Sequence, residues 1–85
     1  MEPEIAFGQV LRELRKGQEL SQEAFALESR LERNYISLLE LGRNSASVKT
    51  IFKLAPALGI SVAEFMAQVE SRAKEKRSGK AKTKG

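Results

Sequence analysis

Residues 21–41, SQEAFALESRLERNYISLLEL, decide the fold of this chain. They contain two helical patterns, with only a short break between them at Arg30-Leu31. The second pattern is two-faced: each residue of a helix turns by about 100°, which places Ile36 and Leu39 opposite Asn34. The stretch therefore predicts two short helices joined by a tight turn, one of which presents its polar face outward.

Three further segments show apolar residues at helical spacing. They cover about residues 3–17, 47–59 and 61–73. Each has a start signal: Pro3, Ser47 and the Ser61–Glu64 capping box. Ser21 is likewise a good N-cap for the first helix of residues 21–41. The residues that make the fourth helix are Val48, Ile51, Phe52, Ala55 and Leu58. No segment alternates as a strand does, so we predict an all-α, compact five-helix domain.

The composition narrows the possible functions. The chain has 85 residues, enough for one domain, and it contains neither Cys nor His. Disulfides, zinc fingers, thiol nucleophiles and imidazole acid–base chemistry are therefore excluded. No apolar run is long enough for a membrane span, and the N-terminus lacks the layout of a signal peptide. We expect no enzyme activity, metal, cofactor or small-molecule ligand.

The positive charge of the chain is concentrated at its C-terminus. Residues 74–85 hold six Lys or Arg and one Glu, whereas residues 1–73 hold nine Lys or Arg and ten Asp or Glu. The net charges are thus +5 and −1. We predict a folded domain over residues 1–73 with a C-terminal dimerisation helix, followed by a basic, disordered tail over residues 74–85. Any DNA affinity of the domain must depend on where its charges lie.

Over about residues 6–65 the chain contains a series of short motifs in a fixed order and spacing. They are Leu20-Ser21-Gln22-Glu23, Ala26, Leu31, Tyr35-Ile36-Ser37, Leu39-Glu40, Gly42-Arg43, Ser47, Thr50-Ile51, Leu54-Ala55 and Ala57-Leu58-Gly59-Ile60-Ser61. In these residues the chain resembles the lambda-repressor-like, or XRE-type, helix-turn-helix family. Its short length further resembles the controller proteins of restriction–modification systems. Small phage, plasmid and antitoxin regulators share that size.

The resemblance implies a sequence-specific transcription regulator. Such a protein binds double-stranded DNA as a homodimer, on a pseudo-palindromic operator, with one recognition helix in each half-site. It would act in the cytoplasm, at its operator on the bacterial nucleoid. The alternative from another class is an antitoxin or adaptor that uses the same fold to bind a protein.

The chain departs from the family pattern at several positions. Arg30 occupies the turn position where the family usually has Gly, and an Arg in left-handed backbone is strained by about 1 kcal/mol. Leu41 stands where the family has Arg, and Ala46 where it has Pro. Pro56 lies inside the fourth helix and removes a hydrogen bond to the carbonyl of Phe52, at a cost of roughly 3 kcal/mol unless the helix kinks.

Base contacts are expected on the outward face of the helix that follows Arg30. Arg33 suits a bidentate contact with guanine, Asn34 one with adenine, and Leu38 a thymine methyl group, with Ser37 close by. The resemblance places base contacts at these same positions. An ordinary solvated helix face would show the same residue types, but it rarely carries two exposed leucines, and here Leu38 is joined by Leu41.

Phosphate contacts are expected beside this helix. The resemblance assigns them to residues at helix starts or in the following loop, namely Gln22, Arg43, Asn44 and Lys49. Phosphate binding needs donors and positive charge, which helix N-termini supply. For Arg43 and Lys49, plain solubility is an equally good interpretation.

A structural ion pair is expected between Arg15 and Glu40. Arg15 follows Leu11 by four residues and Glu40 follows Ile36 by four, so both side chains turn inward. A half-buried carboxylate needs a partner, and the family pattern includes this bridge. With no second acid, metal ligand or nucleophile, Glu40 is not expected to be catalytic.

The fifth helix has an apolar stripe that extends beyond what one small core needs. We expect Phe65 to enter the core, and Met66 and Val69 to form the dimer interface, since the last helix builds the dimer in the small regulators that the chain resembles. Packing of all three residues within one monomer is the alternative.

Overall fold

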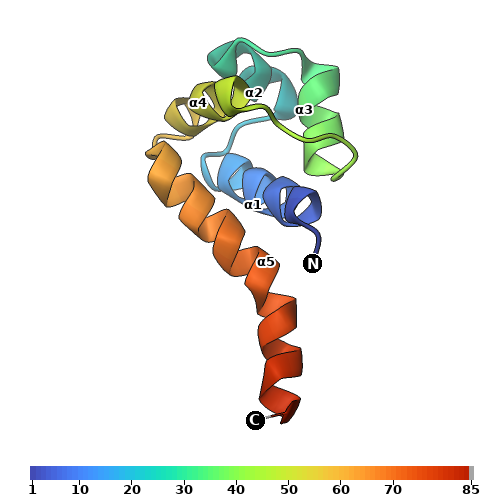
Figure 1. Ribbon diagram of the computed structural model, residues 1–85. Coiled ribbons are helices and arrows are strands. Elements are labelled where there is room, and N and C mark those ends of the chain that lie inside the picture. The colour runs from blue at the N-terminus through green and yellow to red at the C-terminus, as the bar shows by residue number, and fades with distance from the viewer. Residues whose placement is uncertain (85) are drawn as a thin grey trace.

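The computed structural model describes the backbone of residues 1–84 and the side chains of residues 1–75. It contains the five predicted helices (Figure 1): α1 Pro3–Gly17, α2 Gln22–Ser29, α3 Arg33–Glu40, α4 Val48–Ala57 and α5 Val62–Lys84. Over residues 1–84 no strand is present. The all-α prediction is therefore confirmed.

The helices pack around one core. α1 packs against both α3 and α5, while α2 packs against α3 and α4. Figure 1 shows α5 leaving the other four helices and extending beyond them. The largest fully buried side chains come from all five helices and the end of α4: Leu11, Phe25, Ile36, Leu39, Leu54, Leu58 and Phe65. Phe65 contacts Phe7 edge-on, with ring centroids 5.1 Å apart, so its predicted place in the core is confirmed.

Serine caps begin three of the helices as predicted. The hydroxyl of Ser21 accepts a hydrogen bond from the backbone N–H of Ala24 at 3.0 Å. Ser47 caps α4 in the same way, at 3.1 Å, and Ser61 caps α5 at 3.0 Å. Each cap satisfies a backbone donor that the first helical turn leaves free. These local signals position the starts of α2, α4 and α5.

The turn between α2 and α3 is left-handed at Arg30, with φ 60° and ψ 43°. The strain expected for a side chain at this position is therefore present. The backbone N–H of Leu31 donates to the carbonyl of Ala26 at 3.0 Å, which closes the end of α2. α3 starts two residues later, so its direction is fixed by this turn.

Gly8 permits a close contact between α1 and the end of α3. A Cβ atom at Gly8 would lie 2.3 Å from the carbonyl oxygen of Leu39 and 2.7 Å from that of Glu40. Any other residue would push the two helices apart. The sequence gives no sign of this role, because a glycine inside a helical pattern does not show which element approaches it.

Only some of the apolar residues of α4 are buried. Val48 is 70% exposed and Phe52 is 60% exposed, whereas Leu54 and Ala55 are fully buried. The apolar residues of this segment were therefore sufficient to predict the helix α4, but they did not show which of its faces packs in the core. Pro56 lies in the last turn of α4, just before the helix ends at its C-cap Leu58, so the loss of its N–H affects only the end of the helix.

α5 continues through Lys84, where the sequence predicts a disordered tail from residue 74. Residues 62–78 contain neither Gly nor Pro, and Lys, Arg, Glu and Ala favour helix. The division of the chain at residue 74 remains a prediction. Within the described residues no single helix is long and apolar enough to cross a bilayer, and α4 reaches that length only together with the start of α5, across a bend of 104°.

Candidate nucleic-acid interface

α3 turns one face inward and the other toward solvent. Ile36 and Leu39 are 0% exposed. On the opposite side Arg33 and Asn34 are exposed, Ser37 is half-buried, and Leu38 is 37% exposed. The four predicted base-contact residues therefore share the accessible face of one helix, which Figure 1 shows at the edge of the domain.

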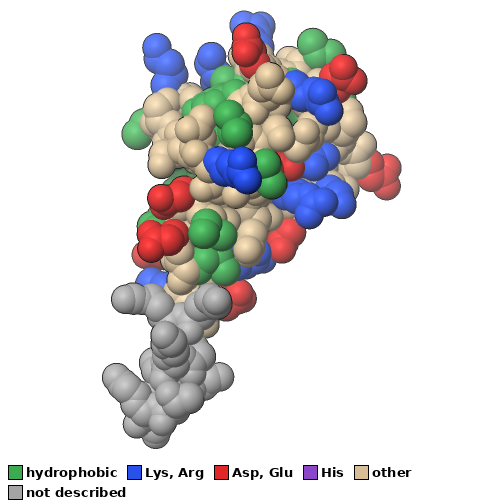
Figure 2. Space-filling view, turned by 90° about the vertical axis from the view of Figure 1, so that its right-hand side faces the viewer, with side chains coloured by type: hydrophobic (Ala, Val, Ile, Leu, Met, Phe, Trp, Pro, Cys, Tyr) green, Lys and Arg blue, Asp and Glu red, His purple; other side chains and the backbone are tan. Residues whose placement is uncertain are grey.

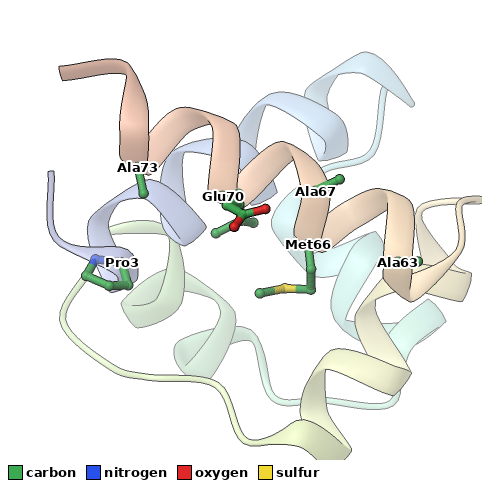
Figure 3. A pocket seen from close by; sticks show the side chains of 7 residues that line it. Pro3, Ala63, Met66, Ala67, Glu70 and Ala73 are labelled. Carbon is green, nitrogen blue, oxygen red and sulfur yellow. The ribbon is translucent and has the colours of Figure 1, made fainter. Parts of the chain in front are cut away.

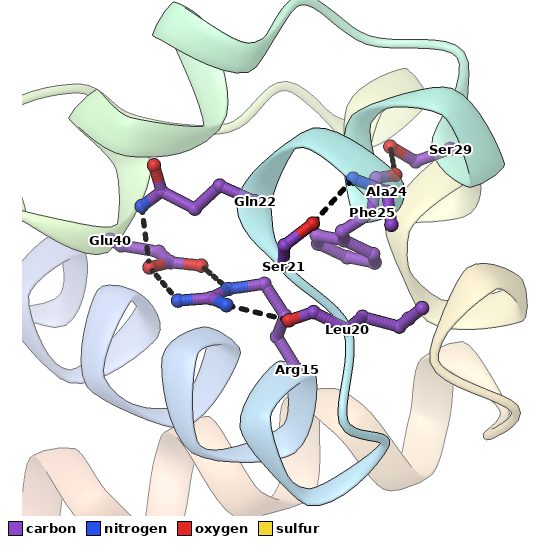
Figure 4. A network of polar contacts seen from close by, with 8 residues as sticks. All are labelled: Arg15, Leu20, Ser21, Gln22, Ala24, Phe25, Ser29 and Glu40. Atoms are coloured by element: carbon purple, nitrogen blue, oxygen red, sulfur yellow. Dashed lines mark hydrogen bonds and ion pairs between the residues drawn. The ribbon is translucent and has the colours of Figure 1, made fainter.

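A buried ion pair holds the inner side of α3 (Figure 4). The Nε of Arg15 donates to Glu40 Oε2 at 2.6 Å, and its Nη2 donates to Oε1 at 3.0 Å. A third guanidinium nitrogen, Nη1, donates to the backbone carbonyl of Leu20 at 2.7 Å. The two side chains are 9% and 3% exposed. The predicted bridge is thus present, and it links α1 to α3 and to the loop before α2.

Gln22 belongs to the same network. Its side-chain amide nitrogen donates to Glu40 Oε1 at 3.0 Å, as Figure 4 shows. Gln22 was expected to contact a phosphate, and this bond was not predicted, because nothing in the local sequence pairs the first residue of α2 with the last residue of α3. An amide nitrogen carries two hydrogens, so one donor remains for a ligand.

The loop after α3 is fixed at both ends. At its start, the backbone N–H of Arg43 donates to the carbonyl of Leu38 at 2.9 Å, with Gly42 in left-handed backbone at φ 74°. At its end, Thr50 accepts a hydrogen bond from the hydroxyl of Ser47 at 3.0 Å. The hydroxyls of Thr50 and Tyr35 lie 3.4 Å apart, which joins α4 to α3. The loop is therefore held in a defined position beside α3.

Four basic or polar side chains are available around α3. Arg43, Asn44 and Lys49 are exposed, and Gln22 is half-buried. Within residues 1–75, no ion pair engages Arg33, Arg43 or Lys49. Figure 2 shows basic and acidic side chains intermixed over one face of the domain, in agreement with the small net charge of residues 1–73. Binding of a polyanion to this domain must therefore depend on where the individual Lys and Arg side chains lie, because the domain has no broad basic surface on this face.

A shallow apolar groove runs along α5 beside the start of α1 (Figure 3). Its lining residues are Pro3, Ala63, Met66, Ala67, Val69, Glu70 and Ala73. Val69 is only 5% exposed and belongs to the core, so the expectation that it forms an open dimer surface needs correction. Its spacing from Met66 is helical, but its side chain is buried in the core cluster. Met66 is half-buried and remains accessible at the groove.

A second apolar surface lies on α4. Val48 and Phe52 are four residues apart and both are mostly exposed, and Pro56 continues the same stripe one turn later.

The described side chains form no group of three or more Asp or Glu that could hold a metal ion. The interface on α3 therefore offers hydrogen-bond donors, positive charge and apolar side chains, which are the groups that duplex DNA engages.

Comparison with known proteins agrees with this geometry. A helix-turn-helix family model, HTH_3, matches residues 11–65. The control protein C.MunI from a Mycoplasma species is 39% identical over 67 residues, which cover 78% of this chain and 90% of that protein.

Two solved structures extend the similarity to three dimensions. The restriction-modification controller protein C.AhdI from Aeromonas hydrophila is 45% identical with a TM-score of 0.71, over 73% of this chain and 94% of that one. The controller protein C.Esp1396I, solved as a tetramer in complex with its natural 35 base-pair operator, has a TM-score of 0.77 at 22% identity. It covers 85% of this chain and 95% of its own, and at that identity it shows the fold alone.

Proposed function

The chain belongs to the HTH_3 helix-turn-helix family, and from that premise we propose that it is a DNA-binding transcription regulator of the restriction–modification controller type. The observation that carries this proposal is α3, whose inner side is locked in the core while Arg33 and Asn34 point outward. The operator complex of C.Esp1396I supports duplex DNA as the ligand. Such a regulator acts in the bacterial cytoplasm, at its operator.

Base reading is assigned to the first half of α3. A major groove admits an α-helix, and its base edges present patterns that side chains distinguish. Arg33 can donate two hydrogen bonds to O6 and N7 of guanine, and Asn34 can pair with N6 and N7 of adenine. Both residues lie in the first turn of α3, so they reach the floor of the groove together. Ser37 and Leu38 follow one turn later on the same face.

Phosphate contacts are assigned to the groups on either side of α3. Gln22 is the first residue of α2 and Lys49 lies in the first turn of α4, where free backbone N–H groups also favour an anion. Arg43 and Asn44 lie in the anchored loop between α3 and α4. These contacts would set the register of the protein on DNA without reading the sequence.

A homodimer is proposed because one helix of eight residues reads only a few base pairs. A two-fold axis would place a second α3 on the next half-site, about 34 Å away or a multiple of that distance, on a pseudo-palindromic operator. We assign the interface to the groove of α5, where Met66 remains accessible. A second copy offers the same apolar surface in return.

The interface can be located by sedimentation of two charge variants. Ala67→Glu introduces a charge at the exposed rim of the groove, and Phe52→Glu does the same on the α4 stripe. Neither residue is buried, so both variants should fold. A monomer at low micromolar concentration is expected for Ala67→Glu only. A monomer for Phe52→Glu alone would move the interface to α4.

The DNA function is tested by selection from random duplexes with the purified full-length chain. We expect one recurring site with approximate two-fold symmetry and half-sites about 34 Å apart. Binding to the selected duplex should exceed binding to random DNA by at least about 10³-fold. Enrichment of no sequence would overturn the proposal and leave the protein-binding adaptor as the better account.

A further inference from the structure

We propose that α3 also reads the C5-methyl group of pyrimidines, through a strip formed by Leu38 and Leu41. This inference deepens the proposed function and rests on it. Leu41 is 62% exposed and Leu38 is 37% exposed, and the two are three positions apart along the helix. The strip therefore follows one side of the same helix that carries Arg33 and Asn34.

Leu41 points in the same direction as the polar base-contact residues. At about 100° per residue, the side chains of Arg33, Ser37, Asn34 and Leu38 spread over an arc of about 140°, and Leu41 falls near its middle. Helical geometry holds as far as Leu41, since its φ and ψ are −83° and −4° and its N–H donates to the carbonyl of Ser37 at 3.0 Å. If Arg33 and Asn34 face a major groove, the side chain of Leu41 therefore points toward the same groove, two turns further along the helix.

The chemistry of leucine selects one class of partner in that groove. Leu38 and Leu41 have no side-chain donor or acceptor, so they cannot bind phosphate or the polar edges of bases. The apolar group that a base pair presents in the major groove is a methyl on C5 of a pyrimidine. Thymine carries this methyl, and 5-methylcytosine carries one at the same ring position. The strip thus fits a C5-methyl group from either source.

The strip is also held in place. The backbone N–H of Arg43 donates to the carbonyl of Leu38 at 2.9 Å, and that of Gly42 to the carbonyl of Leu39 at 3.1 Å. The end of α3 therefore cannot swing away from a bound duplex. The core does not need these two leucines, because Ile36 and Leu39 already fill the inner side of α3 at 0% exposure. Leu41, which departs from the family pattern, would thus contact a C5-methyl group.

The test uses the duplex selected by the full-length protein. At each pyrimidine position, thymine is compared with uracil opposite adenine, and cytosine with 5-methylcytosine opposite guanine, so that each pair differs by one methyl group. The proteins are the wild type, the double variant Leu38→Ala/Leu41→Ala, and Leu27→Ala. Leu27 is 81% exposed on α2 and serves as the matched control. Thermal melts should show all three proteins folded at the temperature of the binding assay. Leu41 and Leu27 are mostly exposed, whereas Leu38 is 37% exposed, so the double variant can melt at a slightly lower temperature.

The wild type should lose about three- to fivefold in affinity when a methyl group that contacts the strip is removed. At that position the double variant should bind both duplexes equally, while Leu27→Ala should behave as the wild type. An effect in the thymine–uracil pair identifies thymine as the source. An effect in the cytosine pair shows that the strip also senses 5-methylcytosine.

Two results would overturn the inference. The wild type could be indifferent to the methyl group in both pairs at every position, or the double variant could keep the wild-type methyl dependence. If in the second case the double variant also sediments as a smaller species than the wild type, the strip contacts a protein partner instead. Selection of no site at all would instead remove the proposed function, and the inference with it.

Discussion

The two faces of α3 differ in what constrains them. On the inner face, Ile36 and Leu39 are fully buried and Glu40 is held by three hydrogen bonds from Arg15 and Gln22. On the outer face, Arg33 and Asn34 are exposed. Substitutions on the inner face should therefore lower the free energy of unfolding, and those on the outer face should change DNA binding while leaving stability intact. One helix of eight residues thus separates folding from recognition.

The largest loss of stability is expected from removal of one partner of the Arg15–Glu40 pair. Either Arg15→Ala or Glu40→Ala leaves a buried charge without its partner, which lowers the free energy of unfolding by about 3–5 kcal/mol. The control is Arg72→Ala, which removes a pair with Glu13 at 2.7 Å whose side chains are 21% and 61% exposed. That variant should lose less than about 1 kcal/mol. Urea unfolding that shows equal losses would contradict the structural role of the bridge.

The next largest effect is expected at Gly8. In Gly8→Ala, the new methyl group meets the backbone oxygens of Leu39 and Glu40, which cannot turn aside, and overpacking of this kind lowers stability by about 1–3 kcal/mol. Gly17→Ala is the control in the same helix, because a Cβ there has no atom within 4 Å. It should be neutral or stabilise the protein by up to about 1 kcal/mol. Similar melting temperatures for the two variants would disprove the close contact of α1 and α3.

On the outer face, Arg33→Ala should weaken binding to the selected site by about 1–3 kcal/mol and relax the preference at one base position. Its free energy of unfolding should stay within about 0.5 kcal/mol of the wild type. Lys49→Ala should instead weaken specific and random DNA alike and reduce the salt dependence of the binding constant by about 0.9 in slope. If both variants lose affinity equally on all sequences, Arg33 is a phosphate contact.

A smaller gain of stability is expected at the turn that directs α3. Arg30 has φ 60°, a conformation that glycine adopts without strain. Arg30→Gly should therefore stabilise the protein by up to about 1 kcal/mol. Arg30→Ala keeps the Cβ and should bring no gain. Equal stabilities of the two variants in urea would show that the left-handed turn is not strained.

The smallest effect is expected from the exposed pair between α1 and α5. The hydrogen bond from Arg72 holds the pKa of Glu13 below its ordinary value. The pair therefore stabilises the fold above the pKa of the unfolded chain, about 4.3, and this contribution disappears as pH falls through the lower pKa of the folded state. Below about pH 5, the free energy of unfolding of Glu13→Gln should fall slightly less steeply with decreasing pH than that of the wild type. High salt should remove the difference between them.

The sequence was sufficient wherever the signal is local. Helical periodicity predicted all five helices, and Ser21, Ser47 and Ser61 marked three of their starts because a hydroxyl caps a helix within three residues. The pairing of Arg15 with Glu40 came from helical spacing together with the family resemblance. The outward direction of Arg33 and Asn34 followed from the same periodicity.

Features that depend on which helices pack against each other could not be predicted from the sequence. The apolar content of α4 did not reveal that Phe52 would face solvent, since that depends on where α2 and α5 pack. The stripe on α5 did not separate Val69, which is buried in the core, from Met66, which remains accessible. Gly8 and the hydrogen bond of Gln22 to Glu40 arise from contacts between distant segments. A single sequence carries no local sign of such contacts.

The most direct test of the two-faced account of α3 is protection of guanine N7 from dimethyl sulfate on the selected duplex. The wild type should protect guanines in the major groove, and Arg33→Ala should lose protection at one guanine in each half-site while the others stay protected, because Arg33 pairs with N7 and O6 of that base. The melting curve of the variant should match the wild type. Protection of no guanine, or an unchanged pattern in Arg33→Ala, would contradict the assignment of base reading to the outer face of α3.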